Sequence, residues 1–165
     1  MPFWVVIFGI AGLFFWILSK NDVPKFSDLD VSDVASKYSS IVNSYLKYYP
    51  DCTCALMLAI ILCESNGDNL AEGSAGERGA MQLKQIALTD FNNAFSKNYY
   101  LTDLQNIYYG VEAGMGYFTL MLQRTNDRAQ AIRAYHSGVG NCEDAAAYYY
   151  EKKVEAAEVL MKGKV

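Results

Sequence analysis

The sequence predicts a mainly α-helical protein with one globular domain and a separate apolar segment at its N-terminus. A chain of 165 residues is long enough for one domain with a real core. From Asp33 onward, apolar residues recur at helical spacing, and no convincing strand pattern or internal repeat interrupts them. Residues 3–18 carry no charge, so all 14 basic and 18 acidic residues lie outside them. We therefore expect a segment at 1–19, a polar linker at 20–32 and a domain at 33–165.

The N-terminal segment has the features of a membrane anchor. A helix over residues 3–18 would be ~24 Å long, and residues 1–19 reach the lower end of the spanning range. Trp4 and Trp16 lie near its two ends, as interfacial rings do. No basic residue precedes the run, and no small-residue cleavage site or lipid-bearing cysteine follows it. We expect an uncleaved transmembrane helix; a signal peptide and a buried helix are the alternatives.

The domain itself divides into helical segments and one irregular loop. Pro24 interrupts the linker, and an amphipathic stripe then runs from Val34 to Leu46. Residues 55–62, ALMLAIIL, predict a helix buried on all sides, and the Gly- and Asn-containing stretch 65–79 predicts a loop. Further helices are expected near 80–88, 103–124, 127–136 and 144–161. Tyrosines cluster at 48–49, 108–109 and 148–150, where they could serve as core or as a stacking surface.

Composition excludes several classes of function. A net charge of -4 does not suit a nucleic-acid binder that relies on a basic surface, and the hydrophobic content outside residues 3–18 is ordinary for a globular domain. The four cysteines have no metal-site spacing, so we expect them to hold no metal. Cys63 is expected to be an apolar filler. A bridge from Cys52 or Cys54 to Cys142 is left open.

Glu64 is the first candidate for chemistry. It ends the apolar run and precedes the loop, and burial there would raise its carboxyl pKa. A carboxyl that stays protonated near neutral pH can act as the general acid at a glycosidic oxygen. The alternative is an ordinary, partly exposed residue at a helix end.

Four short motifs follow one another in order. They are Glu64-Ser65, the stretch SAGERGAMQ at 74–82, NIYYG at 106–110 and AYHSGVGN at 134–141. Together they resemble the soluble lytic transglycosylase family, whose lysozyme-like fold is shared with goose-type lysozymes. The resemblance covers residues 40–160, and it implies a single lysozyme-like helical domain.

The resemblance also implies a mechanism and a set of contacts. Glu64 would protonate the oxygen of the β-1,4 bond between N-acetylmuramic acid and N-acetylglucosamine, and would then accept the C6 hydroxyl proton to give a 1,6-anhydro product. This chemistry needs no metal or cofactor. Gly76, Gly79 and Gly138 would shape loops. The residues expected to bind saccharide are Ser65, Met81, Gln82, Asn106, Tyr135 and His136; for Met81 and Tyr135, core packing is the alternative.

Two positions depart from the family pattern. Ala80 stands where leucine is usual, which is expected to enlarge a wall of the groove. His136 stands where asparagine is usual and is the only histidine in the chain. A metal-ligand role is disfavoured for a lone histidine. Its ring can still hydrogen-bond a sugar, and its charge would titrate near pH 6.5.

The function predicted on this basis is a membrane-anchored peptidoglycan lytic transglycosylase for local cell-wall opening. Its partners would be glycan strands and a lipid membrane through residues 3–18, with envelope, secretion or virion assembly partners also possible and nucleic acid excluded. Its domain would face peptidoglycan from the bacterial inner membrane, or from the membrane of a lipid-containing phage virion.

Two other functions are the alternatives. One is a non-catalytic peptidoglycan-binding assembly protein. The other is a goose-type hydrolase, which needs a second carboxylate to activate water. The carboxylates available for that role fall in no defensible motif; they are Asp68, Asp90, Asp103 and Glu112.

Overall fold

A computed structural model describes residues 25–165, and within them the predicted helical domain is confirmed. The predicted membrane helix at 3–18 lies outside the described residues. Among residues 25–165 there is no strand, only two isolated bridges, Glu72–Arg78 and Arg78–Leu83. The elements are α1 (Asp28–Tyr45), α2 (Cys54–Ser65), α3 (Gln85–Phe95), the 3-10 helix η1 (Leu101–Gln105), α4 (Ile107–Thr125), α5 (Arg128–Ser137), the 3-10 helix η2 (Val139–Asn141) and α6 (Ala145–Lys162).

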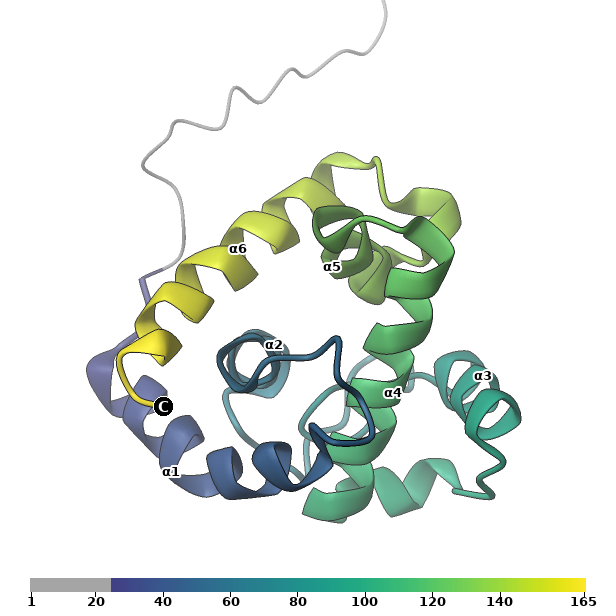
Figure 1. The fold of residues 1–165 in the computed structure, drawn as a ribbon, viewed down its shortest axis with the longest axis horizontal. Coiled ribbons are helices and arrows are strands. Elements are labelled where there is room, and N and C mark those ends of the chain that lie inside the picture. The colour runs from purple at the N-terminus through teal and green to yellow at the C-terminus, as the bar shows by residue number, and fades with distance from the viewer. Residues whose placement is uncertain (1–24) are drawn as a thin grey trace, which may run out of the picture.

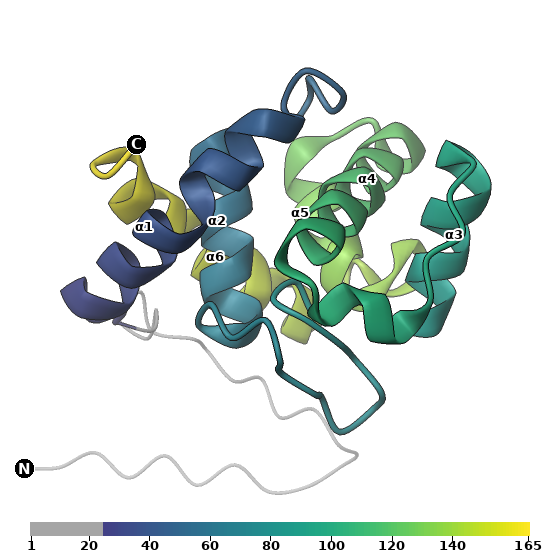
Figure 2. The ribbon, with the colours of Figure 1, turned by 90° about the horizontal axis from the view of Figure 1, so that it is seen from below.

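The helices surround α2. Figure 1 shows α2 end-on, between α1, α4 and α6. Seen from below, α1, α2 and α6 form one group and α3, α4 and α5 the other (Figure 2). The C-terminus returns to α1, where the Lys164 ammonium donates to the Ser32 hydroxyl at 3.1 Å.

Helix α2 is buried on all sides, as its unbroken apolar run predicts. Residues 55–62 are each at most 6% exposed. The Thr53 side chain accepts from the Leu56 N–H at 3.3 Å and so caps the N-terminus. Asn66 adopts the left-handed conformation at φ 54° and ends the helix, with its N–H donating to the Leu62 carbonyl. Glu64 is consequently the second-to-last residue of a helix anchored in the core.

Helix α1 begins at Asp28, earlier than the expected start at Asp33. The Ser27 side chain accepts from the Asp30 N–H at 3.1 Å, and two acidic residues occupy the first turn. Both features stabilise a helix N-terminus. The start signal was therefore present inside the segment read as a linker.

Two other helix boundaries differ from the prediction. Residues 80–84 are not helical, because Arg78 and Leu83 exchange two backbone hydrogen bonds that close a turn ahead of α3. The expected helix at 103–124 is divided at Asn106, which ends η1 and caps α4 by accepting from the Tyr108 N–H at 3.0 Å.

Glycine allows the loop after α2 to lie close to the rest of the domain. Gly79 has a φ of +79°, and a Cβ there would overlap the Leu104 carbonyl. In the same way, a Cβ at Gly114 of α4 would overlap the Met81 thioether. The loop residues 79–81 thus pack directly on η1 and α4.

The possible disulfide to Cys142 is not formed, and all four cysteines are free. The Cys52 thiol contacts the Met115 carbonyl and the Thr119 hydroxyl, whereas the Cys142 thiol lies beside Glu143. Burial raises the pKa of Cys52 and of Cys63 to about 12, so both are held as apolar, unreactive thiols.

The helices found over residues 25–165 are each too short or too polar to cross a bilayer.

Candidate active site

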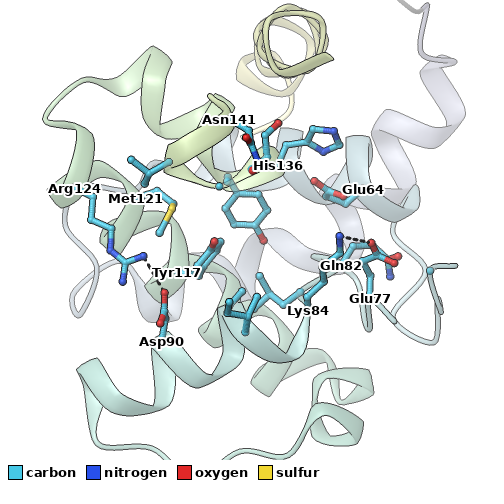
Figure 3. A pocket seen from close by; sticks show the side chains of 18 of the residues that line it. Glu64, Glu77, Gln82, Lys84, Asp90, Tyr117, Met121, Arg124, His136 and Asn141 are labelled. Atoms are coloured by element: carbon cyan, nitrogen blue, oxygen red, sulfur yellow. Dashed lines mark hydrogen bonds and ion pairs between the residues drawn. The ribbon is translucent and has the colours of Figure 1, made fainter. Parts of the chain in front are cut away.

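Glu64 lies at the wall of a large cleft. The cavity has a volume of about 820 Å³, and its lining comes from the end of α2, the loop before α3, and parts of α3, α4, α5 and the η2 region. Figure 3 shows Glu64, Glu77, Gln82 and His136 toward one end of the cleft, and Asp90 and Arg124 at the other. A carboxyl at the end of the buried helix α2 thus faces a groove whose walls come from several other elements.

The environment of Glu64 favours its protonated form. Burial raises the pKa of the Glu64 carboxyl to about 7, while the nearby Tyr150 hydroxyl and the Lys153 ammonium act in the opposite direction. The Lys153 ammonium donates to the Cys63 carbonyl at 2.7 Å, so this cation is fixed at the C-terminal end of α2. Glu64 can therefore donate a proton near neutral pH.

Three of the predicted saccharide-binding residues line the cleft: Gln82, Tyr135 and His136. Gln82 has a φ of +48°, and its amide donates to the Ala71 and Gly79 carbonyls, so it also holds the loop in place. Tyr135 is 7% exposed and its hydroxyl donates to the Met81 carbonyl at 2.9 Å. Both side chains are already positioned by the fold.

The other three are not among the residues that line the cavity. The Ser65 hydroxyl donates to the Ala80 carbonyl at 2.8 Å and joins the end of α2 to the loop. Met81 is buried in the core, which agrees with the alternative of core packing given for it above. Asn106 caps α4. Their contact with saccharide stays a prediction.

Ala80, expected to widen the groove, does not line it either. Ala80 is 1% exposed and is not among the residues that line the cavity. The smaller side chain therefore bears on packing beneath the loop and not on the surface of the groove.

Tyr150 and Lys153 are functional candidates that sequence reasoning missed. Both come from α6, which packs along α2. Tyr150 is 5% exposed, and its hydroxyl has no hydrogen-bond partner of standard geometry within residues 25–165. Burial raises the pKa of the Tyr150 phenol, and the nearby Glu64 carboxylate raises it further. The tyrosine triple at 148–150 was a visible signal, but the packing of α6 against α2 was needed to select Tyr150.

Ion pairs border both ends of the cleft. Lys84, which precedes α3, lies 3.2 Å from Glu77, and Arg124 of α4 lies 2.9 Å from Asp90 of α3. Hydrogen bonds to backbone N–H groups and the contact with Lys84 lower the pKa of the Glu77 carboxyl. Glu77 is therefore ionised at a neutral pH at which Glu64, with a pKa of about 7, still keeps much of its proton.

The buried Arg133 holds in place the segment around η2, which forms part of the cleft wall. Arg133 of α5 donates from its guanidinium to the Cys142 carbonyl at 2.7 Å, to Glu143 at 3.0 Å and to Glu151 of α6 at 2.5 Å. Tyr148 covers the guanidinium, with the ring centroid 4.2 Å from Cζ. Arg133 thereby ties α5, the η2 segment and α6 together, and with them the positions of His136 and Tyr150.

Nothing in residues 25–165 gathers three or more metal-ligating side chains. Near Glu64 the cleft presents the Glu77 carboxylate, the His136 imidazole and the Gln82 amide, and Asp90 and Asp144 are further carboxyls on its lining.

The comparison with known families agrees with this helical domain and its cleft. The model of the family described as Transglycosylase SLT domain matches residues 46–157, and the chain belongs to that family. No curated protein matches the chain.

Solved structures share the fold. One is an inactive mutant of the lytic transglycosylase Slt of Pseudomonas aeruginosa, with a TM-score of 0.71, 17% identity and coverage of 78% of this chain. Another is the 70 kDa soluble lytic transglycosylase of Escherichia coli, with a TM-score of 0.70, 18% identity and coverage of 76%. The matched region spans 24% of each of those chains. The predicted lysozyme-like domain of this family is thus confirmed as the fold.

Proposed function

We propose that this domain is a peptidoglycan lytic transglycosylase in which Glu64 serves first as acid and then as base. The observation that carries the proposal is the Glu64 carboxyl, protonated near neutral pH, on the wall of a glycan-sized cleft. Membership of the transglycosylase SLT family supports the reaction class.

The reaction needs only this one carboxyl. Glu64 gives its proton to the glycosidic oxygen as the bond from that oxygen to the anomeric carbon of N-acetylmuramic acid breaks. The 2-acetamido oxygen of the same sugar stabilises the positive charge on the anomeric carbon. The Glu64 carboxylate then removes the proton from the C6 hydroxyl, whose oxygen bonds the anomeric carbon. The products are a 1,6-anhydro end and a free hydroxyl on N-acetylglucosamine, and Glu64 is again protonated.

The other cleft residues have supporting roles in this reaction. Tyr150 and Lys153 moderate the rise in the Glu64 pKa, which keeps the carboxylate accessible as the base of the second step. Tyr135 and Gln82 present polar groups on the wall, and Tyr117 stacks edge-on against Tyr135 with 5.4 Å between the ring centroids. An aromatic and amide surface suits a neutral glycan better than bulk charge would.

Hydrolysis is the second candidate, and Glu77 favours it. This carboxylate is ionised, lines the cleft and is near enough to raise the pKa of Glu64. An inverting hydrolase combines a protonated carboxyl, its general acid, with an ionised carboxylate that activates water. Glu77 lies within the SAGERGAMQ stretch at 74–82, but it was not among the carboxylates considered from the sequence.

The products decide between these activities. Full-length protein incubated with purified sacculi should release muropeptides with 1,6-anhydro ends, detected by mass spectrometry; reducing ends would assign the hydrolase. Glu64→Gln should abolish release. Glu72→Gln, a change at an exposed glutamate outside the cleft that pairs with Arg78, is the matched control and should leave release intact. No release of either product by the wild-type protein would favour the non-catalytic alternative.

We further propose that residues 3–18 anchor the protein in a membrane with the domain facing peptidoglycan, in a cell envelope, a secretion system or a lipid-containing virion. The uncharged run with Trp4 and Trp16 near its ends supports the anchor. The experiment is extraction of membranes from expressing cells at alkaline pH. Retention in the pellet supports an anchor, and release into the supernatant contradicts it.

A further inference from the structure

His136 is held flat against the tyrosine that approaches the catalytic carboxyl. Its ring stacks on Tyr150, with 4.5 Å between the centroids and 11° between the planes. His136 comes from the last turn of α5 and Tyr150 from α6, so the stack joins two elements. The imidazole remains exposed on its other side and lines the cleft, toward the same end as Glu64 (Figure 3).

The Tyr150 hydroxyl gives this stack a chemical consequence. It is buried without a hydrogen-bond partner of standard geometry among the described residues, and it approaches Glu64. A buried hydroxyl costs free energy unless it is hydrogen-bonded, and the Glu64 carboxyl is near enough to be its partner. The orientation of the Tyr150 ring, and hence the distance from its hydroxyl to Glu64, depends on what covers the ring, and His136 covers it.

Charged groups face His136 from every side of the cleft. Lys153 comes from α6, Lys84 from the segment before α3, Glu77 from the loop and Glu64 from α2, and Asp144 also lines the cavity. Lys84 is paired with Glu77 at 3.2 Å, while Lys153 is fixed at the end of α2 by the Cys63 carbonyl. Partial burial, with the two lysines, lowers the pKa of the His136 imidazole below 6.5.

We propose that His136 is a positioning and saccharide-contacting residue that works only as the neutral imidazole, and that its protonation sets the acid limit of the enzyme. A neutral ring can accept a hydrogen bond from a sugar hydroxyl at one nitrogen, whereas the imidazolium only donates. A positive charge beside Glu64 would also favour the carboxylate and withdraw the proton that the reaction needs. The inference rests on the transglycosylase function proposed above, and it adds a group that this chain has in place of the usual asparagine.

The two groups define a window of pH. Glu64 must be protonated, so activity falls as pH rises through about 7. His136 must be neutral, so activity falls as pH drops through a midpoint below 6.5. Both conditions hold only between the two midpoints, which predicts a narrow bell-shaped profile.

The kinetic test is the pH profile of kcat/KM on sacculi for full-length protein. Wild type should lose about tenfold per pH unit on the acid side, below the His136 midpoint. His136→Asn, which restores an uncharged amide, should keep its activity at those pH values while retaining the alkaline limb of Glu64. Tyr149→Phe, which alters a tyrosine outside the cleft, is the control and should follow wild type. An unchanged acid limb in His136→Asn would overturn the proposal.

A second measurement does not depend on turnover. Because His136 is the only histidine in the chain, the imidazole signal in an ¹⁵N spectrum belongs to it without assignment. In the Glu64→Gln variant, addition of N-acetylchitotetraose at pH 7 should shift this signal, and its titration midpoint should lie below 6.5. A signal that chitotetraose leaves unmoved would overturn the inference even if sacculi are cleaved. A shifted signal without cleavage by wild type would instead refute the proposed reaction while supporting the saccharide contact.

Discussion

Replacing Glu64 by glutamine should make the protein more stable at alkaline pH and equally stable at acid pH. The pKa of a glutamate is ordinarily 4.5, and in the folded protein that of Glu64 is about 7. The folded state therefore keeps this proton up to higher pH than the unfolded chain does, so stability is lost as pH rises from 4.5 to 7. Each pH unit of difference corresponds to ~1.4 kcal/mol. Because the side chain is partly exposed, we expect the ionisation of Glu64 to lower the free energy of unfolding of the wild type by about 2–3 kcal/mol in total.

The assay is urea unfolding followed by far-ultraviolet circular dichroism at 25 °C. At pH 4 the free energies of unfolding of wild type and Glu64→Gln should agree. At pH 8.5 the variant should be more stable by about 2–3 kcal/mol, or roughly 5–10 °C in melting temperature. Groups common to both proteins, including His136, cancel in the comparison. A gain of the same size at both pH values, or none at pH 8.5, would refute the account of a buried acid that opposes ionisation.

Three other changes test the supports of the cleft. Gly79→Ala should lower the free energy of unfolding by about 2 kcal/mol more than Gly76→Ala does, which is a typical cost of overpacking. Both positions have positive φ, but only at Gly79 would a Cβ overlap neighbouring backbone. Thermal melts of the two variants compare them directly. Arg133→Met should lower the free energy of unfolding in urea by about 3–5 kcal/mol, because the carboxylates that Arg133 binds lose a buried partner. A loss below about 1 kcal/mol would contradict the role of Arg133 in joining α5, the η2 segment and α6. Tyr150→Phe should move the alkaline limb of the activity profile to higher pH, because the hydroxyl lowers the pKa of Glu64; a limb that stays in place would show that the hydroxyl does not act on the carboxyl.

The sequence predicted those parts of the molecule that depend on local pattern. The apolar run at 55–62 identified the central helix, and its last residues identified Glu64 as a half-buried acid. Helix boundaries were predicted less well. The turn that Arg78 and Leu83 close is made by hydrogen bonds between residues five apart, which apolar periodicity does not register.

The walls of the site were harder to predict, because they depend on packing between distant segments. Tyr150 reaches Glu64 only because α6 lies along α2, some 85 residues later in the chain. Glu77 is in the cleft because a glycine-containing loop turns back on itself. Ser65 and Asn106 match motif positions, yet they hold the backbone in shape, which a motif alone cannot distinguish from contact with a substrate.

The burial of α2 separates the helix that carries Glu64 from the more exposed segments of the groove. The acid is carried by a helix whose residues 55–62 all touch the core, so changes in this helix would be felt as loss of folding before any change in activity. Part of the groove is instead formed by two mostly exposed segments, residues 72–77 and 138–141. Exchange of these two segments between relatives is therefore a route to new glycan or peptide preferences that leaves the proton donor where it is.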